Sequence, residues 1–159
     1  MKETVFVSFA DGSQRVETLH RDLKHGGLCA SKGRLHRAIL TGVDYPMSDF
    51  TWADLRGAFL SDSCFKSARF EESQLITAFL DGCDLSYCCF SGATMRFADL
   101  SRSILVGADF SRADCFRVNF TEADLRGANM RAEHVETASF VGCLYDETTV
   151  WPHGFLPLA

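Results

Sequence analysis

The stretch ADLRGANMRA at residues 123–132 contains two copies of a five-residue unit that recurs along most of the chain. Other clear copies are ADLRG at 53–57, ADLSR at 98–102 and ADFSR at 108–112. Twenty-four residues from Leu35 to Val150 have numbers that are multiples of five; ten of them are Leu, seven are Phe, and none is charged. A large apolar residue is therefore expected at every fifth position over this range, with no insertion.

Small residues precede the large ones by two places. Twelve of these 24 positions hold Ala, and most of the others hold Ser or Cys. The residue between the two is often Asp or Asn, and seven of the twelve glycines follow the large residue by two places. Glu133 departs from the pattern, because it puts a carboxylate in a small-residue position.

A period of five fits neither an α-helix, with 3.6 residues per turn, nor a strand, with a period of two. It indicates a coil whose corners recur every five residues, with one large and one small side chain pointing inward on each side. Glycine suits a corner at which the backbone needs a positive φ. Stacked coils of this kind pair their backbones at about 4.8 Å, as strands do in a sheet.

The charges indicate four sides per coil. Like charges stacked directly above one another are unfavourable. At a spacing of 20 residues, between 33 and 152, no like-charge pair occurs. The opposite-charge pairs at that spacing are Arg34/Asp54, Asp49/Arg69, Arg102/Glu122 and Arg126/Asp146. A three-sided coil would stack like charges such as Asp84 on Asp99, so four sides are favoured.

The repeat resembles the A-(D/N)-(L/F)-x-x motif of the pentapeptide-repeat proteins, over about 120 of the 159 residues. The ending from Tyr145 to Phe155 is similar to the Y-D-x-x-T-x-W-P-x-G-F ending of many bacterial members. The resemblance implies an all-β fold, a right-handed quadrilateral β-helix. Twenty-four units predict about six coils.

Both ends of such a rod need protection, because an end coil exposes apolar side chains and unpaired backbone groups. Residues 1–32 are expected to form an N-terminal cap, 33–150 the β-helix, and 151–159 a C-terminal cap or tail. The first cap is either a hairpin, with strands near 4–9 and 14–18 joined by a turn at 10–13, or a short helix over 16–25. At the other end, apolar side chains either fold over the last coil or form a subunit contact: Trp151, Pro152, Phe155, Leu156 and Leu158.

Composition and motifs argue against catalysis. The chain has a net charge of −5, and 47% of its residues are hydrophobic. It contains no apolar run long enough for a membrane helix, no signal-peptide core and no phosphate-loop or metal motif. Its seven cysteines predict reduced thiols in a cytoplasmic protein, with Cys88 and Cys89 as core filler. We therefore expect no enzyme, no cofactor and no metal.

Two surface features are candidates for partner binding. Ile39, Phe59 and Phe79 fall in one outward column, in a position that elsewhere holds Asp or Asn. They form either a binding patch or a stabilising aromatic ladder that the N-terminal segment covers. A second face is basic and aromatic, and its candidates are Arg56, Arg96, Phe97, Phe116 and Arg117. Arginine with aromatic residues is a common interface composition.

The leading functional hypothesis is a non-enzymatic scaffold or protein-interaction module with an unidentified protein partner. The alternative comes from the resemblance, since some pentapeptide-repeat proteins mimic DNA and modulate type II topoisomerases. Direct nucleic-acid binding is disfavoured by the acidic balance. The sequence leaves open whether the protein is a monomer or a homodimer.

Overall fold

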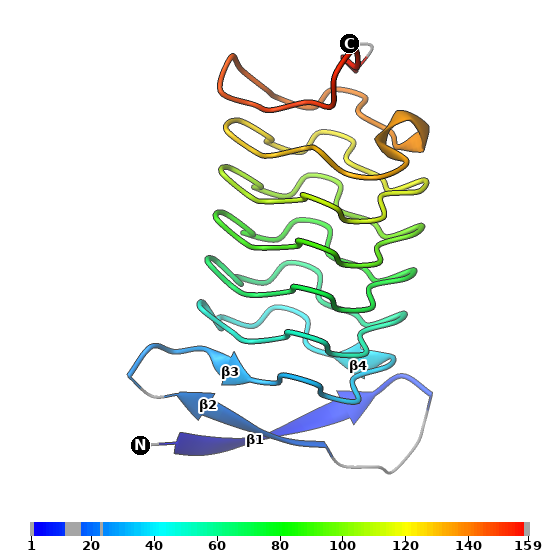
Figure 1. Ribbon diagram of the computed structural model, residues 1–159. Coiled ribbons are helices and arrows are strands. Elements are labelled where there is room, and N and C mark those ends of the chain that lie inside the picture. Colours follow the sequence, from blue (N-terminus) through cyan, green and yellow to red (C-terminus); the bar gives the residue numbers. More distant parts are fainter. Residues whose placement is uncertain (1, 12–16, 23, 158–159) are drawn as a thin grey trace.

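The computed structural model describes residues 2–11, 17–22 and 24–157, and it is a rod of stacked coils with a β-hairpin at one end (Figure 1). The strands are β1 (Lys2–Phe9), β2 (Glu17–Asp22), β3 (Leu28–Cys29) and β4 (Ala38–Ile39). One short 3-10 helix, η1, spans Val135–Thr137. In the described part of the chain, no helix has the length and apolarity needed to cross a membrane.

The coils are held together by parallel bridges between residues 20 apart. The series runs from Cys29↔Asp49 to Asp109↔Asn129 in steps of five residues. In each step one backbone N–H donates to the preceding coil and the next donates to the following coil, as Asp54 N does to Gly33 O and Leu55 N does to Gln74 O. Each turn therefore has four five-residue sides, as the charge pattern predicted.

The core follows the five-residue pattern closely. From Phe50 to Met130, every large residue in the series is fully buried, and Ala, Ser or Cys fills nearly all of the small positions between them. Phe50, Phe70, Phe90 and Phe110 form one internal ladder, with neighbouring ring centroids 4.9 Å apart. Ring stacking at nearly the strand spacing lets one side of the rod repeat without voids.

The corners from Lys32 to Gly127 share one backbone feature, a positive φ. The residue two places after the large one has a positive φ at each repeat from Lys32 to Gly127, whether or not it is glycine. At most of these corners the next N–H donates back to the carbonyl of the large residue, as Ala53 N does to Phe50 O at 2.9 Å, whereas Val43 N and Cys83 N donate to the hydroxyls of Ser63 and Ser103. A positive φ at the third residue is the mark of a type II turn. Glycine eases the corner, but Trp52 and Tyr87 show that large side chains are accepted there.

The N-terminal segment is a hairpin and not the alternative helix over 16–25. β1 and β2 pair antiparallel from Lys2↔Asp22 to Val7↔Glu17, and the sheet order is β3-β2-β1-β4. Val7, Phe9 and Leu19 are buried beneath the first coil, whereas Phe6 points outward. The turn expected at 10–13 lies partly outside the described residues, as do positions 14–16 of the expected second strand.

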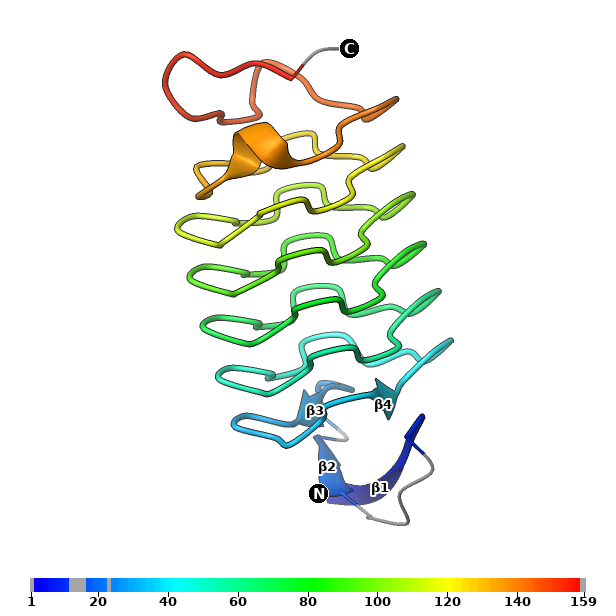
Figure 2. The same cartoon turned by 90° about the vertical axis from the view of Figure 1, so that its right-hand side faces the viewer.

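The repeat loses its register at Glu133, contrary to the prediction of an uninterrupted series. Glu133 bridges to Asp114 at a spacing of 19 and is exposed, while Ala132 takes the inward position. A carboxylate is too costly to bury in a dry core without a partner. The short turn η1 restores the spacing, since Ser139 pairs with Asn119 (Figure 2).

A second shift follows near the C-terminus. Tyr145 and Val150 were expected inside, but each is 37% exposed. Val150 bridges to Asn129 at a spacing of 21, and Thr149 takes the small inward position, donating to Leu125 O at 3.0 Å.

The aromatic side chains that follow lie over the end of the core. The ring of Trp151 meets that of Phe140 edge-on at 5.3 Å, and Phe155 lies 6.0 Å from the same ring. Leu156, in contrast, is 69% exposed. Leu158 lies outside the described residues.

Candidate functional site

The predicted apolar column is assembled on one side of the rod. Ile39, Phe59 and Phe79 are joined in order by parallel bridges, and the rings of Phe59 and Phe79 stack at 5.0 Å with an angle of 10° between them. Phe79 is 40% exposed and Ile39 is 43% exposed, while Phe59 between them is half-buried. The column then continues with Asp99, Asn119 and Ser139, so the apolar part ends at Phe79.

The N-terminal strand does not cover this column. β1 extends the ladder past Ile39 through the pair Ser8↔Ile39. It therefore adds a rung next to Ile39 and leaves the outward faces of Ile39 and Phe79 open to solvent.

A shallow groove of about 390 Å³ runs beside the column. Its lining residues are His36, Arg37, Gly57, Thr77, Phe59 and Phe79. Gly57 and Thr77 are small corner residues on adjacent coils. The stacked rings of Phe59 and Phe79 line the groove beside them. The sequence predicted the two outward phenylalanines, but the groove was missed. The pattern that could have indicated the groove is two small corner residues, Gly57 and Thr77, spaced by 20 beside these phenylalanines.

The basic and aromatic candidates come together only in part. The guanidinium carbon of Arg96 lies 4.8 Å from the ring centroid of Phe116, and that of Arg117 lies 5.8 Å from the same centroid. Phe97 meets Phe116 edge-on at 5.5 Å and is 49% exposed. Arg56 is two coils away from Arg96 and does not join this cluster.

The candidate arginines differ in whether a carboxylate of the same chain neutralises them. Arg56 donates to both carboxylate oxygens of Asp54, each at 2.8 Å, and these hydrogen bonds hold the pKa of Asp54 below its ordinary value. Arg96 approaches Asp114 only to 3.6 Å, and the other oxygen of Asp114 lies 3.0 Å from His134 Nδ1. Among the described residues, Arg117 has no carboxylate partner. Charge is thus neutralised at Arg56 and left available at Arg117.

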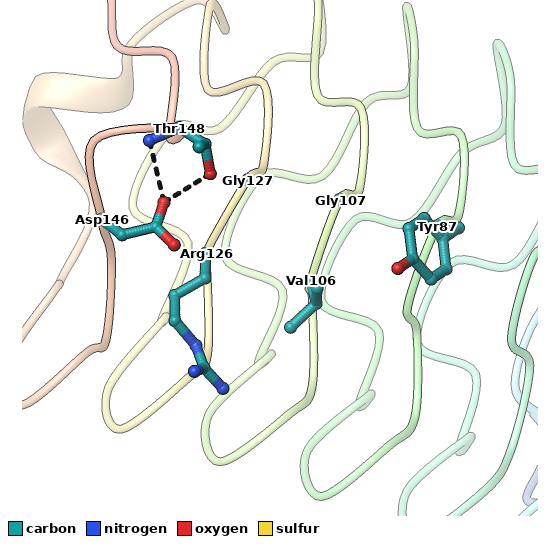
Figure 3. Close-up of a pocket in the computed structure, with 7 residues that line it drawn as sticks. All are labelled: Tyr87, Val106, Gly107, Arg126, Gly127, Asp146 and Thr148. Atoms are coloured by element: carbon teal, nitrogen blue, oxygen red, sulfur yellow. Dashed lines mark hydrogen bonds between the residues drawn. The ribbon is translucent and has the colours of Figure 1, made fainter.

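A second hollow, of about 480 Å³, lies on another corner (Figure 3). Gly107 and Gly127 form its floor, with the ring of Tyr87 at one end and the turn from Asp146 to Thr148 at the other. Asp146 accepts hydrogen bonds from the backbone N–H and the hydroxyl of Thr148. Both bonds go to Oδ1 of Asp146, and the guanidinium of Arg126, which also lines the hollow, is bonded to Asp124.

All seven cysteines are free thiols; Cys83, Cys88 and Cys115 are buried. Burial raises the pKa of Cys83 to about 12, and it also raises the pKa of the Cys88 thiol. No group of three or more His, Cys, Asp or Glu side chains in the described ranges is placed to hold a metal ion.

Comparison with known proteins agrees with this geometry. The sequence profile of the family Pentapeptide repeats matches residues 34–71, 63–96 and 93–131, in eight copies. These matches extend over more than half of the chain, and the chain belongs to the pentapeptide-repeat family. The family implies that the four-sided coil is a right-handed quadrilateral β-helix. A comparison with curated protein sequences found no match.

Three solved structures illustrate the likeness. The pentapeptide repeat protein alr5209 from Nostoc PCC 7120 is 31% identical, with 58% of this chain and 76% of that one covered and a TM-score of 0.56. HetL, involved in heterocyst differentiation regulation in Nostoc sp. strain PCC 7120, is 25% identical over 72% of this chain and 71% of that one, with a TM-score of 0.46. A trypsin-treated form of QnrB1, a plasmid-mediated fluoroquinolone resistance protein, is 24% identical over 80% of this chain and 69% of that one, with a TM-score of 0.42.

Proposed function

We propose that this protein is a non-enzymatic scaffold that binds a protein partner through the surface formed by Ile39, Phe59 and Phe79. The observation that carries the proposal is the outward stack of Phe59 on Phe79 beside the groove. Contiguous exposed apolar groups with a polar surrounding are typical of interaction sites. The same column is polar from Asp99 onward, so the apolar patch is a local departure from the repeat.

A rigid support suits this role. The rod holds each surface residue on a hydrogen-bonded rung, so the patch needs little ordering when a partner binds, which favours affinity. The free thiols fit the proposal that the protein works in a reducing compartment such as the cytoplasm.

The alternative, a DNA-mimicking modulator of a type II topoisomerase, has less support. A DNA mimic presents unpaired carboxylates along its length, whereas Asp54 and Asp124 are bonded to Arg56 and Arg126. Arg37, Arg96 and Arg117 also place positive charge on one side of the rod. A DNA supercoiling assay in which molar excess of the protein leaves gyrase unaffected would remove this alternative.

Affinity capture from the native host with the double variant Phe59→Asn/Phe79→Asn tests the scaffold proposal. Asn119 already occupies this column and donates to Asp99 at 3.0 Å, so an asparagine at 79 has a ready partner and the rod should fold. We expect the partner to be lost with this variant and kept with Trp52→Asn, which removes an exposed ring from another corner. Capture of the same partners by the double variant would contradict the proposal.

A further inference from the structure

One corner of the rod carries an arginine at each end, with the groove that Gly57 and Thr77 line next to the first arginine and the exposed ring of Phe97 next to the second. Its residues are Arg37, Gly57, Thr77, Phe97 and Arg117, which we call the arginine-ended corner. They lie one above another, because the N–H groups of Arg37, Gly57 and Thr77 donate to the carbonyls of Arg56, Ile76 and Arg96, each at 2.9 Å. Four coil steps of about 4.8 Å separate the two arginines by about 19 Å.

The middle of this corner is open. A Cβ on Gly57 would meet only the side-chain stem of Arg37 at 3.6 Å and the hydroxyl of Thr77 at 3.8 Å. The Thr77 hydroxyl donates to the carbonyl of the preceding residue, Ile76. The stacked rings of Phe59 and Phe79 line one side of this floor. The groove spans Arg37 to Thr77 on this corner, and the two rings give it one apolar side.

The two ends are cationic and unneutralised. Arg37 and Arg117 are exposed, and within the described ranges neither forms an ion pair. Near the second end, the guanidinium carbon of Arg96 lies 4.8 Å from the ring centroid of Phe116, and Arg96 pairs with Asp114 only at 3.6 Å. An arginine stacked on a ring keeps its N–H edge free to bind a carboxylate through two parallel hydrogen bonds.

We propose that the arginine-ended corner binds an extended protein segment of about seven residues, with an acidic side chain at each end and apolar side chains between. Six steps of about 3.3 Å span about 20 Å, which matches the distance between the arginines. Residues 1, 3, 5 and 7 of an extended segment point the same way, so acidic residues 1 and 7 meet Arg37 and Arg117. Residue 3 then enters the groove, and residue 5 reaches the exposed ring of Phe97. This inference rests on the proposed function and specifies the partner of the same site.

Charge favours a protein segment over nucleic acid. The carboxylates of Asp99 and Asp114 flank the Phe97 end of the corner, and the whole chain carries a charge of −5. A continuous phosphate backbone would place negative charge beside these two carboxylates. A segment with charge only at its ends avoids it.

The test is a fluorescence anisotropy titration with a blocked, labelled peptide, Glu-Ser-Leu-Ser-Leu-Ser-Glu. We expect saturable binding to the wild-type protein and loss of binding when Lys replaces both Glu residues. Arg37→Ala and Arg117→Ala should each weaken binding by about fivefold. The matched control is Arg112→Ala, an exposed corner arginine with the same positive φ on another corner.

A second variant tests the groove without changing charge. Thr77→Tyr places a ring on the floor, and the fold accepts rings at this corner position, as Tyr87 and Phe97 demonstrate. We expect it to abolish peptide binding while thermal unfolding stays near the wild-type temperature.

Three results of the peptide titration would overturn the inference. They are no saturable binding, binding that neither arginine substitution weakens, and equally strong binding of a single-stranded oligonucleotide that the same substitutions weaken. The proposed function fails separately, if Phe59→Asn/Phe79→Asn retains the partner captured from the host. A captured partner that needs Phe79 but not Arg37 or Arg117 would therefore reject this inference and keep the proposed function.

Discussion

The ring of Phe90 stacks on that of Phe110 with a centroid distance of 4.9 Å and an angle of 10° between the rings. Phe70 lies at the same distance on the other side. All three side chains are fully buried, so each ring contacts its neighbours across the coil spacing and not only within its own coil. The ladder ties successive coils into one cooperative core.

Removal of the central ring should be severely destabilising. Phe90→Ala would leave a cavity between two rings that cannot collapse onto each other, because the backbone bridges hold the coils apart. We expect the free energy of unfolding to fall by about 3–5 kcal/mol, and by a smaller amount for Phe90→Leu. Urea unfolding followed by circular dichroism measures this. Equal stabilities of Phe90→Ala and wild type would contradict the ladder.

Corner conformation can be tested without changing the core. Gly42 has φ of 68°, and a Cβ there would meet nothing within 4 Å, so Gly42→Ala changes only backbone strain. We expect a loss of about 1 kcal/mol. Ser67 has φ of 58° and is exposed, so Ser67→Gly should gain about 0.5–1 kcal/mol. A gain in stability for Gly42→Ala together with a loss for Ser67→Gly would show that the corners do not hold this conformation.

Thiol reactivity should follow burial. Cys29 is exposed, whereas Cys83, Cys88 and Cys115 are buried, and burial raises the pKa of each of the three buried thiols. With a thiol reagent at pH 8, we expect a fast native reaction at Cys29 that Cys29→Ser abolishes, and reaction of all seven thiols after unfolding. Modification of Cys88 before unfolding, located by mass spectrometry, would contradict this prediction.

The pair of Asp124 and Arg126 should make stability depend on pH in the acid range. Hydrogen bonds from Arg126, at 2.6 and 2.9 Å, hold the pKa of Asp124 below 3.8 in the folded protein. A lowered folded pKa contributes stability that is present above the unfolded pKa, near 4, and is lost as the pH falls through the folded value. The difference in the free energy of unfolding between wild type and Asp124→Asn should therefore be larger at pH 7 than at pH 2.5.

The control for this experiment removes the partner. In an Arg126→Met background, the Asp124→Asn substitution should change the urea midpoint by nearly the same amount at both pH values. A difference that keeps its full pH dependence without Arg126 would show that another group sets the pKa of Asp124.

Much of the fold could be predicted from the sequence, because a five-residue period admits few solutions. The large residues at multiples of five must share one interior, and the charges favour a four-sided coil over a three-sided one. The column of Ile39, Phe59 and Phe79 followed from the same arithmetic, since residues 20 apart must stack. Such inferences depend on spacing along the chain, and repeats preserve spacing.

The tertiary structure decided what spacing does not encode. The register shift at Glu133 depends on the energy of burying a carboxylate, and the placing of Thr149 instead of Thr148 in the small inward position depends on a hydrogen bond to Leu125 O. The choice of a hairpin over a helix at the N-terminus depends on pairing of β1 with β4 and of β2 with β3. Side-chain conformation decided which arginines are neutralised: Arg56 turns back to Asp54 in its own coil, and Arg117 lies beside Phe116. A period fixes where a residue stands, whereas competition among nearby partners fixes what its side chain contacts.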